Sequence, residues 1–216
     1  MKNQESSVFI DVQTALVELQ AGKMLIMMDD HDRENEGDLV MAADWVSHEA
    51  INFMTREGRG LVCAPITQER SRELRLDRMT ALNTALHETN FTVSIDAVGT
   101  TSTGISAHDR AATIRALIDP KTEPENLARP GHIFPLIASQ GGVLHRRGHT
   151  EAIVYLASLA GLTPAGVICE ILADDGSMAG LADLVKMAEN WGLKIITVQD
   201  VAEYCLQRKK GGMKNA

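Results

Sequence analysis

The sequence has few aromatic residues and no long apolar run, and these absences exclude several classes of protein. Aromatic residues make up 4% of the 216 residues, so the core must consist mainly of aliphatic side chains and methionine. No apolar stretch approaches the roughly 20 residues that span a bilayer, and residues 1–5 lack the hydrophobic character of a signal peptide. We therefore expect a cytoplasmic protein without a membrane-spanning segment.

Cysteine pairs and clusters of basic residues are also missing. The three cysteines, Cys63, Cys169 and Cys205, lie far apart and form no C-x-x-C motif, which argues against a disulfide framework or a structural zinc site. The net charge of −8 disfavours nucleic acid or anionic lipid as a partner, because such binding needs clustered lysine and arginine. With 44% hydrophobic residues, the chain can instead bury a substantial core.

No internal repeat, low-complexity tract or linker divides the chain, so the sequence predicts one domain over residues 1–216 with a flexible tail at 209–216. Apolar spacing and cap residues alternate between helical and extended patterns. The predicted fold is α+β (mixed α/β), a single compact domain with a mixed sheet flanked by helices. Helices are expected at 12–22, 47–56, 106–118, 149–161, 181–190 and from a cap at Asp200 onward, and strands at 24–28, 61–66, 91–96, 167–171 and 193–198.

The remaining stretches, 29–38, 97–105, 119–150 and 172–179, are expected to be loops, where functional residues usually lie. The first holds six carboxylates in ten residues. It is either a solvated acidic loop or a divalent cation site. An EF-hand is excluded, because counting from Asp32 puts Ala43 where the bidentate glutamate should be. Magnesium or manganese bound by one or two carboxylates, with water and substrate completing the shell, fits better.

A second segment, Arg146-Arg147-Gly148-His149-Thr150-Glu151, lies where a predicted loop becomes a helix. Free backbone N–H groups at a helix start, the Thr150 hydroxyl and the Arg146 guanidinium would together suit a phosphate monoester. The alternative is an ordinary helix start with solvent-exposed arginines. His149 adds a candidate metal ligand, although a lone histidine is more often a hydrogen-bonded structural residue.

Three further segments carry weaker indications of function. Arg129-Pro130-Gly131-His132 is expected in a loop, where the Pro-Gly turn would aim His132 at a fixed point or carry it incidentally. Glu170 ends an apolar strand, a position that suits either proton transfer or simple pairing with a neighbour. The hydroxyl-rich run 100–106 could bind phosphate or sugar hydroxyls, or merely form turns.

Four motifs taken together point to a known family. They are Asp-Arg-Glu-Asn-Glu-Gly-Asp at 32–38, Phe-Thr-Val-Ser-Ile-Asp at 91–96, Arg-Pro-Gly-His at 129–132 and Gly-His-Thr-Glu at 148–151. This pattern closely resembles 3,4-dihydroxy-2-butanone 4-phosphate synthases, over about residues 12–204. The resemblance implies a lyase of riboflavin biosynthesis that depends on Mg²⁺ or Mn²⁺ and forms a homodimer with active sites near the subunit interface.

The implied reaction converts D-ribulose 5-phosphate to L-3,4-dihydroxybutan-2-one 4-phosphate and formate through enolisation, dehydration, skeletal rearrangement and loss of C4. By motif position, Glu34 and His149 correspond to metal ligands, and His132 and Glu170 to essential catalytic residues. The chain has Arg147 where the motif commonly has glycine, which leaves the role of this residue open. The implied substrate-binding residues are Arg33, Glu34, Asp38, Arg146, Arg147, Gly148, His149 and Thr150.

Members of this family are often fused to a C-terminal GTP cyclohydrolase II domain, and this chain resembles the monofunctional form. Two rival functions stay open. One is a metal-dependent isomerase or aldolase acting on a similar phosphosugar, from which formate release would distinguish a synthase. The other is a sugar-phosphate or divalent-ion sensor without turnover, and the presence of both His132 and Glu170 argues against it.

Overall fold

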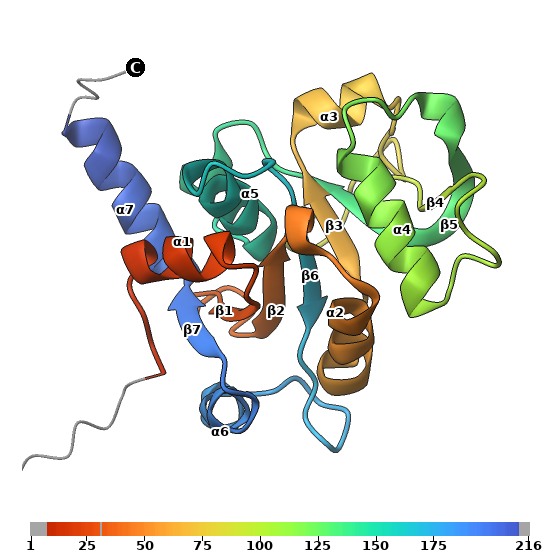
Figure 1. The fold of residues 1–216 in the computed structure, drawn as a ribbon. Coiled ribbons are helices and arrows are strands. Elements are labelled where there is room, and N and C mark those ends of the chain that lie inside the picture. The colour runs from red at the N-terminus through yellow and green to blue at the C-terminus, as the bar shows by residue number, and fades with distance from the viewer. Residues whose placement is uncertain (1–7, 31, 212–216) are drawn as a thin grey trace, which may run out of the picture.

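The structure, a computed structural model, describes residues 8–30 and 32–211. Its centre is a seven-stranded mixed sheet with the strand order β4-β5-β3-β6-β2-β1-β7 (Figure 1). The strands are β1 (Leu25–Met28), β2 (Gly37–Ala42), β3 (Cys63–Ile66), β4 (Ile95–Ala97), β5 (Leu127–Ile137), β6 (Gly166–Glu170) and β7 (Lys194–Thr197). The helices are α1 (Val12–Gln20), α2 (His48–Phe53), α3 (Gln68–Glu73), α4 (Ala107–Ile118), α5 (His149–Leu159), α6 (Leu181–Trp191) and α7 (Val198–Lys210).

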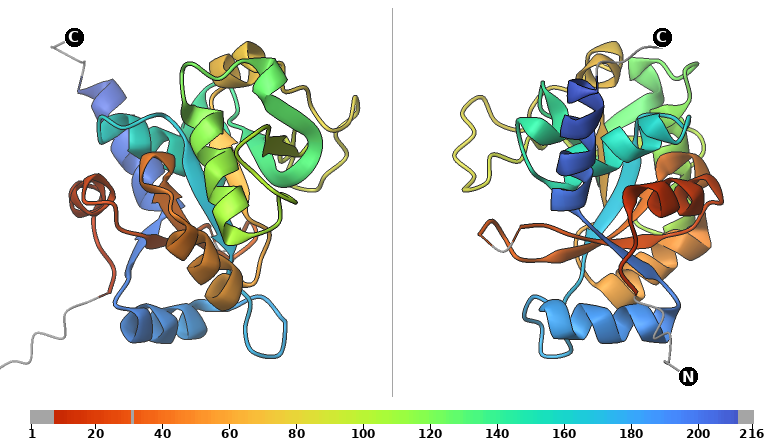
Figure 2. Two further views of the ribbon diagram at one scale, coloured as in Figure 1. Left: turned by 45° about the vertical axis from the view of Figure 1, so that its right-hand side comes forward. Right: turned by 90° about the vertical axis from the view of Figure 1, so that its left-hand side faces the viewer.

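Helices cover both faces of the sheet, which explains the uninterrupted apolar runs of its central strands. Successive side chains of a strand point to opposite faces. In β1, Ile26 therefore packs into a cluster with residues of α2, α4 and α6, whereas Met27 packs into a second cluster with residues of α1, α5 and α7. The two views of Figure 2 show helices on either side of the strands. The predicted α+β class, with a mixed sheet flanked by helices, is confirmed.

The cap residues explain where several helices begin. Ser47 Oγ accepts a hydrogen bond from Ala50 N–H at 3.2 Å, and Ser106 Oγ accepts one from Asp109 N–H at 3.0 Å, so α2 and α4 start where the sequence predicts. The prediction for α7 was wrong in one detail. Its cap is Thr197, whose hydroxyl accepts from the N–H of Asp200 at 3.0 Å.

The stretch expected as a loop at 119–150 contains the longest strand, β5. The segment Arg129–His132 therefore lies within a strand and not in a turn, which corrects the sequence prediction. Prolines and glycines ordinarily weaken strands, but here β5 is stabilised by pairing with β3 on one side and β4 on the other. Strand β2 and helix α3 were also missed, and the expected strand at 91–96 is regular only in β4, with isolated bridges at Phe91 and Thr92.

The hairpin of β1 and β2 positions the acidic segment. Met28 pairs with Gly37, so residues 29–36 form the connection between two central strands. In the right-hand view of Figure 2, this connection and the yellow loop at 77–90 project from the same side of the molecule. At the C-terminal end, Lys209 and Lys210 belong to α7, while residues 212–216 of the expected tail lie outside the described residues. No described helix has the length and apolar character needed to cross a membrane.

Candidate active site

A cavity of about 220 Å³ lies on the α5 side of the sheet. Asp38 of β2 and Glu170 of β6 are direct partners in the antiparallel ladder, and such partners point to the same face. Both side chains line the cavity, together with Cys63 of β3. The first residues of α5 and the β1–β2 connection close it from other sides. The regular alternation of the strands therefore brings two carboxylates from distant parts of the chain into one site.

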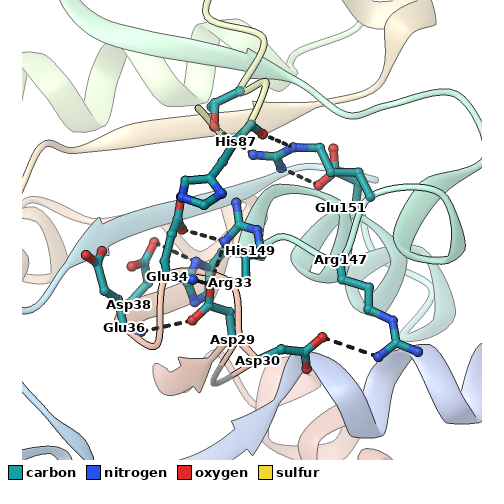
Figure 3. A network of polar contacts seen from close by, with 12 residues as sticks. Asp29, Asp30, Arg33, Glu34, Glu36, Asp38, His87, Arg147, His149 and Glu151 are labelled. Carbon is teal, nitrogen blue, oxygen red and sulfur yellow. Dashed lines mark hydrogen bonds and ion pairs between the residues drawn. The ribbon is translucent and has the colours of Figure 1, made fainter. Parts of the chain in front are cut away.

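Asp29 organises the acidic connection from within. Its buried carboxylate accepts hydrogen bonds from Arg33 Nη1 at 2.6 Å, from Glu36 N–H at 2.9 Å and from Glu34 N–H at 3.2 Å (Figure 3). A carboxylate with three such partners serves as a structural anchor. It holds Glu34 and Glu36 against the cavity, and the site thereby gains two further carboxylates.

The other end of the acidic segment turns away from the cavity. Asp30 pairs with Arg147, with 3.3 Å between Oδ2 and Nη1, and 52% of the Arg147 side chain is exposed. Figure 3 shows Arg147 extending away from the groups around His149. His31 lies outside the described residues. The acidic segment is thus partly surface and partly the wall of a cavity, and its interpretation as a divalent cation site stays a prediction.

The carboxylates that face the cavity outnumber the nearby cations. Burial raises the pKa of Asp38 well above its ordinary value, and the carboxylates of Glu170 and Glu34 raise it further. Burial, with Glu34 and Asp29 nearby, likewise raises the pKa of Glu36. Arg33 offsets part of this charge through its contacts with Asp29 and Glu34. The cavity is therefore electrostatically suited to a cation.

His149 has the properties of a metal ligand. Its Nε2 atom is buried and has no hydrogen-bond partner among the described residues. Burial lowers the pKa of His149 to about 4, although the Asp29 carboxylate opposes the shift, so the imidazole is neutral at pH 7. Nδ1 lies 3.7 Å from Asp38 Oδ2, and a proton held there would leave the lone pair of Nε2 for a metal, an arrangement common in metal-binding histidines.

No protein-only cage surrounds this atom. Within residues 8–30 and 32–211, no three His, Cys, Asp or Glu side chains are grouped so as to hold a metal ion. A cation bound here would complete its shell with water or substrate oxygens. Mg²⁺ usually binds in this way, through one or two carboxylates.

Arg146 lines the cavity but is not a free arginine. Its guanidinium donates to Glu151 Oε2 at 2.7 Å, to Thr89 Oγ1 at 2.6 Å and to the carbonyl oxygen of His87 at 3.0 Å. These bonds use three of its five N–H groups and fix the direction of the rest. A Cβ atom at residue 148 would collide with this guanidinium, so a larger residue there would displace Arg146 from these hydrogen bonds.

The start of α5 offers backbone donors beside Arg146. Gly148 is the cap residue and provides no side chain to satisfy the first N–H groups of the helix. Thr150, which is buried, also lines the cavity. The groups of the predicted anion site, namely helix N–H groups, a hydroxyl and a guanidinium, therefore lie close together.

The loop at 77–90 contributes residues that sequence reasoning missed. Thr89 lines the cavity and binds Arg146, and His87 Nε2 lies 3.9 Å from Glu34 Oε1 (Figure 3). The segment carries no regular pattern or recognisable motif that would have singled out either residue. Only the fold brings this loop over the acidic connection.

Glu170 is both anchored and directed into the cavity. Its Oε2 accepts a hydrogen bond from Leu61 N–H at 2.8 Å, and Gly60 leaves the necessary space, since a Cβ there would come within 2.5 Å of the same oxygen. Glu170 can therefore pair with Leu61 and still line the cavity.

His132 lies outside the cavity, on β5, and so is not brought together with Glu170 in one chain. Leu136, which does line the cavity, is four residues further along β5, a rise of roughly 13 Å. His132 is instead paired with Asp96 of β4. Asp96 Oδ1 accepts from His132 N–H at 2.9 Å, and Oδ2 lies 2.7 Å from Nδ1 of the ring.

The motif order and this geometry agree with a comparison against known families. A sequence profile of 3,4-dihydroxy-2-butanone 4-phosphate synthase matches residues 13–204. The chain belongs to this family. The family membership that was predicted from four short motifs is thereby confirmed.

Two curated relatives of the 3,4-dihydroxy-2-butanone 4-phosphate synthase family give the degree of similarity. The riboflavin biosynthesis protein RibBA of Cytophaga hutchinsonii is 56% identical over 196 residues, which are 90% of this chain and 48% of that protein. RibBA of Aquifex aeolicus is 55% identical over 212 residues, which are 97% of this chain and 52% of that protein. The chain spans about half the length of the curated relatives it matches.

Solved structures of the family share the fold. A 3,4-dihydroxy-2-butanone 4-phosphate synthase in complex with two magnesium ions superposes with a TM-score of 0.89 at 42% identity, covering 94% of this chain and 99% of that one. RibBX, a two-domain synthase from A. baumannii, gives a TM-score of 0.87 at 51% identity, covering 90% of this chain and 57% of that one.

Proposed function

We propose that this chain converts D-ribulose 5-phosphate to L-3,4-dihydroxybutan-2-one 4-phosphate and formate, as a lyase of riboflavin biosynthesis. The observation that carries the proposal is the cavity itself, in which four carboxylates and the Nε2 of His149 lie beside a helix start and Arg146. Within residues 8–30 and 32–211, this Nε2 has no hydrogen-bond partner. Membership of the synthase family and the RibBA relatives support it. A cytoplasmic location, expected from the sequence, stays a prediction.

The proposed reaction uses Mg²⁺ or Mn²⁺ held by Glu34 and His149. The excess of carboxylates and the neutral imidazole support this assignment, as does the related synthase solved with two magnesium ions. When bound, a divalent cation acts as a Lewis acid that stabilises the oxyanions of the reaction. Arg33 would orient Glu34, since its guanidinium contacts that carboxylate and Asp29 together.

The remaining cavity residues are assigned by chemistry. The free N–H groups at Gly148, His149 and Thr150 and the unused donors of Arg146 would hold the phosphate. Asp38 faces the same space and would accept hydrogen bonds from sugar hydroxyls when ionised. Arg147 is the exception among the residues predicted to bind substrate, because it pairs with Asp30 outside the cavity.

Glu170 and His132 are the proposed proton carriers, and their separation has a consequence. A single cavity contains Glu170 but not His132, whose side chain is 40% exposed. The proposed homodimer would resolve this, with His132 of one chain completing the cavity of the other. This proposal follows the subunit-interface active site implied by the family resemblance.

A formate assay tests the proposal against its rivals. The purified chain, ribulose 5-phosphate and Mg²⁺ should yield one formate for each substrate consumed. An isomerase or aldolase would consume the sugar phosphate without formate, and a sensor would bind it without consuming it. Either result would disprove the synthase assignment.

A further inference from the structure

The Asp96–His132 pair is built more rigidly than its exposed position requires. Asp96 contacts His132 twice, once through the backbone N–H and once through ring atom Nδ1. Because one carboxylate fixes both the main chain and the ring, the imidazole has little freedom to rotate about its side-chain bonds. The role inferred for this pair rests on the function proposed above.

A neighbouring loop encloses the pair from one side. Gly104 has a φ of +90°, and a Cβ at this residue would collide with the side chains of Asp96 and His132. The loop is held in place by Asp109, which accepts from Ser102 N–H at 3.0 Å, from Ser102 Oγ at 2.8 Å and from Gly104 N–H at 3.1 Å. Residues 102–104 of the hydroxyl-rich run therefore support the Asp96–His132 pair and do not line the candidate active-site cavity.

The contact determines which ring nitrogen is reactive. An ionised carboxylate can only accept hydrogen bonds, so a carboxylate oxygen 2.7 Å from Nδ1 places the imidazole proton on that nitrogen. Nε2 then carries the lone pair. Since the ring is 40% exposed, that lone pair can meet a substrate.

We propose that Asp96 is a positioning residue for the reaction, which holds His132 in the one tautomer and orientation that let Nε2 act as a general base. In the proton-transfer step, Nε2 takes a proton from the carbon next to the substrate carbonyl. The electron pair of the broken C–H bond stays with the substrate as an enediolate. The imidazolium is stabilised by Asp96, which does not itself change protonation, and the proton later returns to the carbon skeleton.

The substitution Asp96→Asn separates positioning from folding. The amide oxygen of asparagine can still accept from His132 N–H, so the β4–β5 contact is kept. Its NH₂ group then faces Nδ1, which must become an acceptor, and the ring proton moves to Nε2. We expect kcat to fall on the order of 10²- to 10⁴-fold, with KM within about threefold because no substrate contact is removed.

A matched control is Asp44→Asn, which alters an aspartate that binds Thr163 N–H and Oγ1 through similar geometry but lies in neither candidate site. Its kcat should equal that of the wild type. Equal kcat values for Asp96→Asn and the wild type would overturn the inference.

Nitrogen-15 NMR of the histidine rings reads the His132 tautomer directly, and a tautomer change together with a fall in kcat at an unchanged KM separates positioning from a purely structural role. The His132 signal, assigned by its loss in His132→Asn, should report an Nδ1–H tautomer in the wild type and an Nε2–H tautomer in Asp96→Asn. An unchanged tautomer would contradict the inference. This measurement needs no turnover, so a wild-type chain that makes no formate would refute the proposed function and still leave the role of Asp96 measurable.

Discussion

The cavity beneath the β1–β2 connection and the Asp96–His132 corner hold their reactive groups by opposite means. In the cavity, burial and the neighbouring carboxylates raise the pKa values of Asp38 and Glu36, and a buried ring nitrogen has no partner among the described residues. In the corner, one carboxylate is matched to one imidazole. The first region has an excess of carboxylates that suits a cation, whereas in the second the Asp96 carboxylate already has its hydrogen-bond partners.

This difference separates two kinds of chemistry within one chain. A crowded acidic cavity gains stability when a divalent ion binds, because the ion offsets the repulsion between carboxylates. The Asp96–His132 pair is held by its own hydrogen bonds and should keep its geometry with or without the ion. Removing the metal or substituting a residue in one region should therefore leave the geometry of the other region unchanged.

Metal removal should have the largest effect, and only on the cavity. Treatment with EDTA should abolish formate production, and Mg²⁺ or Mn²⁺ should restore it, because the carboxylates and Nε2 of His149 would lack their cation. Mg²⁺ at about 100 times its Kd should also stabilise the fold by about 2.7 kcal/mol, visible as a higher Tm. The nitrogen-15 signal of His132 should still report the Nδ1–H tautomer. Full activity in metal-free protein would disprove metal dependence.

Loss of a metal ligand should have the next largest effect. Glu34→Gln and His149→Ala should each lower activity by more than about 10²-fold, since ligand substitutions exceed the 10- to 100-fold losses typical of residues that only support ligands. The Tm increase caused by Mg²⁺ should vanish in both. Asp30→Asn is the matched control, because Asp30 belongs to the same acidic segment but pairs outward with Arg147. A collapse in metal-free thermal stability would instead indicate structural roles.

Substitution of the proton carriers should spare binding. For His132→Asn and Glu170→Gln, formate production should fall by roughly 10²-fold or more, while calorimetry should give near-normal affinities for Mg²⁺ and ribulose 5-phosphate. The Mg²⁺ affinity of His132→Asn is the sharper test, because His132 is not one of the proposed metal ligands. Loss of Mg²⁺ binding in that variant would mean that the two regions are not independent.

Arg146→Ala should raise KM by about 10- to 100-fold, the loss expected when hydrogen bonds to a charged group are removed. Arg146→Lys should retain part of the affinity, since an ammonium group supplies charge without the planar pair of donors. Part of the loss would be indirect, because Arg146 also holds the loop at His87 and Thr89. An unchanged KM in Arg146→Ala would place the phosphate elsewhere.

Arg147→Ala should have the smallest effect. The exposed pair with Asp30 contributes about 0–1 kcal/mol at most, and the side chain does not line the cavity. We expect KM to change by less than about twofold in the steady-state formate assay. A KM increase comparable to that of Arg146→Ala would show that this arginine turns inward when substrate binds.

Structural features that depend only on neighbouring residues could be predicted from the sequence. The caps at Ser47 and Ser106 and the apolar spacing of α5 are properties of neighbouring residues, so those helices could be located. Strand β5 could not, because Pro130, Gly131 and Pro135 are unfavourable locally and the strand forms only through pairing with β3 and β4. The register that opposes Asp38 to Glu170 also depends on pairing between segments far apart in the chain.

The candidate site likewise contains residues that local motifs identify and residues that only long-range folding places there. Glu34, Asp38, His149 and Glu170 lie in recognisable segments, and the structure brings them into one cavity, while their roles stay predictions. His87 and Thr89 could not be found, since their role comes from the path of a loop without regular pattern. The roles of Asp29 as an anchor and of Arg147 as an outward-facing residue were likewise invisible, because composition does not reveal which of six neighbouring carboxylates will be buried.

The antiparallel pairing of Asp38 with Glu170 also limits how the length of this chain can change during evolution. A residue inserted into β2 between Asp38 and Ala42 would move the Asp38 carboxylate to the opposite face of the sheet, where α2, α4 and α6 pack. An insertion at the exposed turn 174–176 would leave the ladder untouched. We therefore expect insertions and deletions among homologues to accumulate at such solvent-facing turns, and β2 and β6 to keep a constant length.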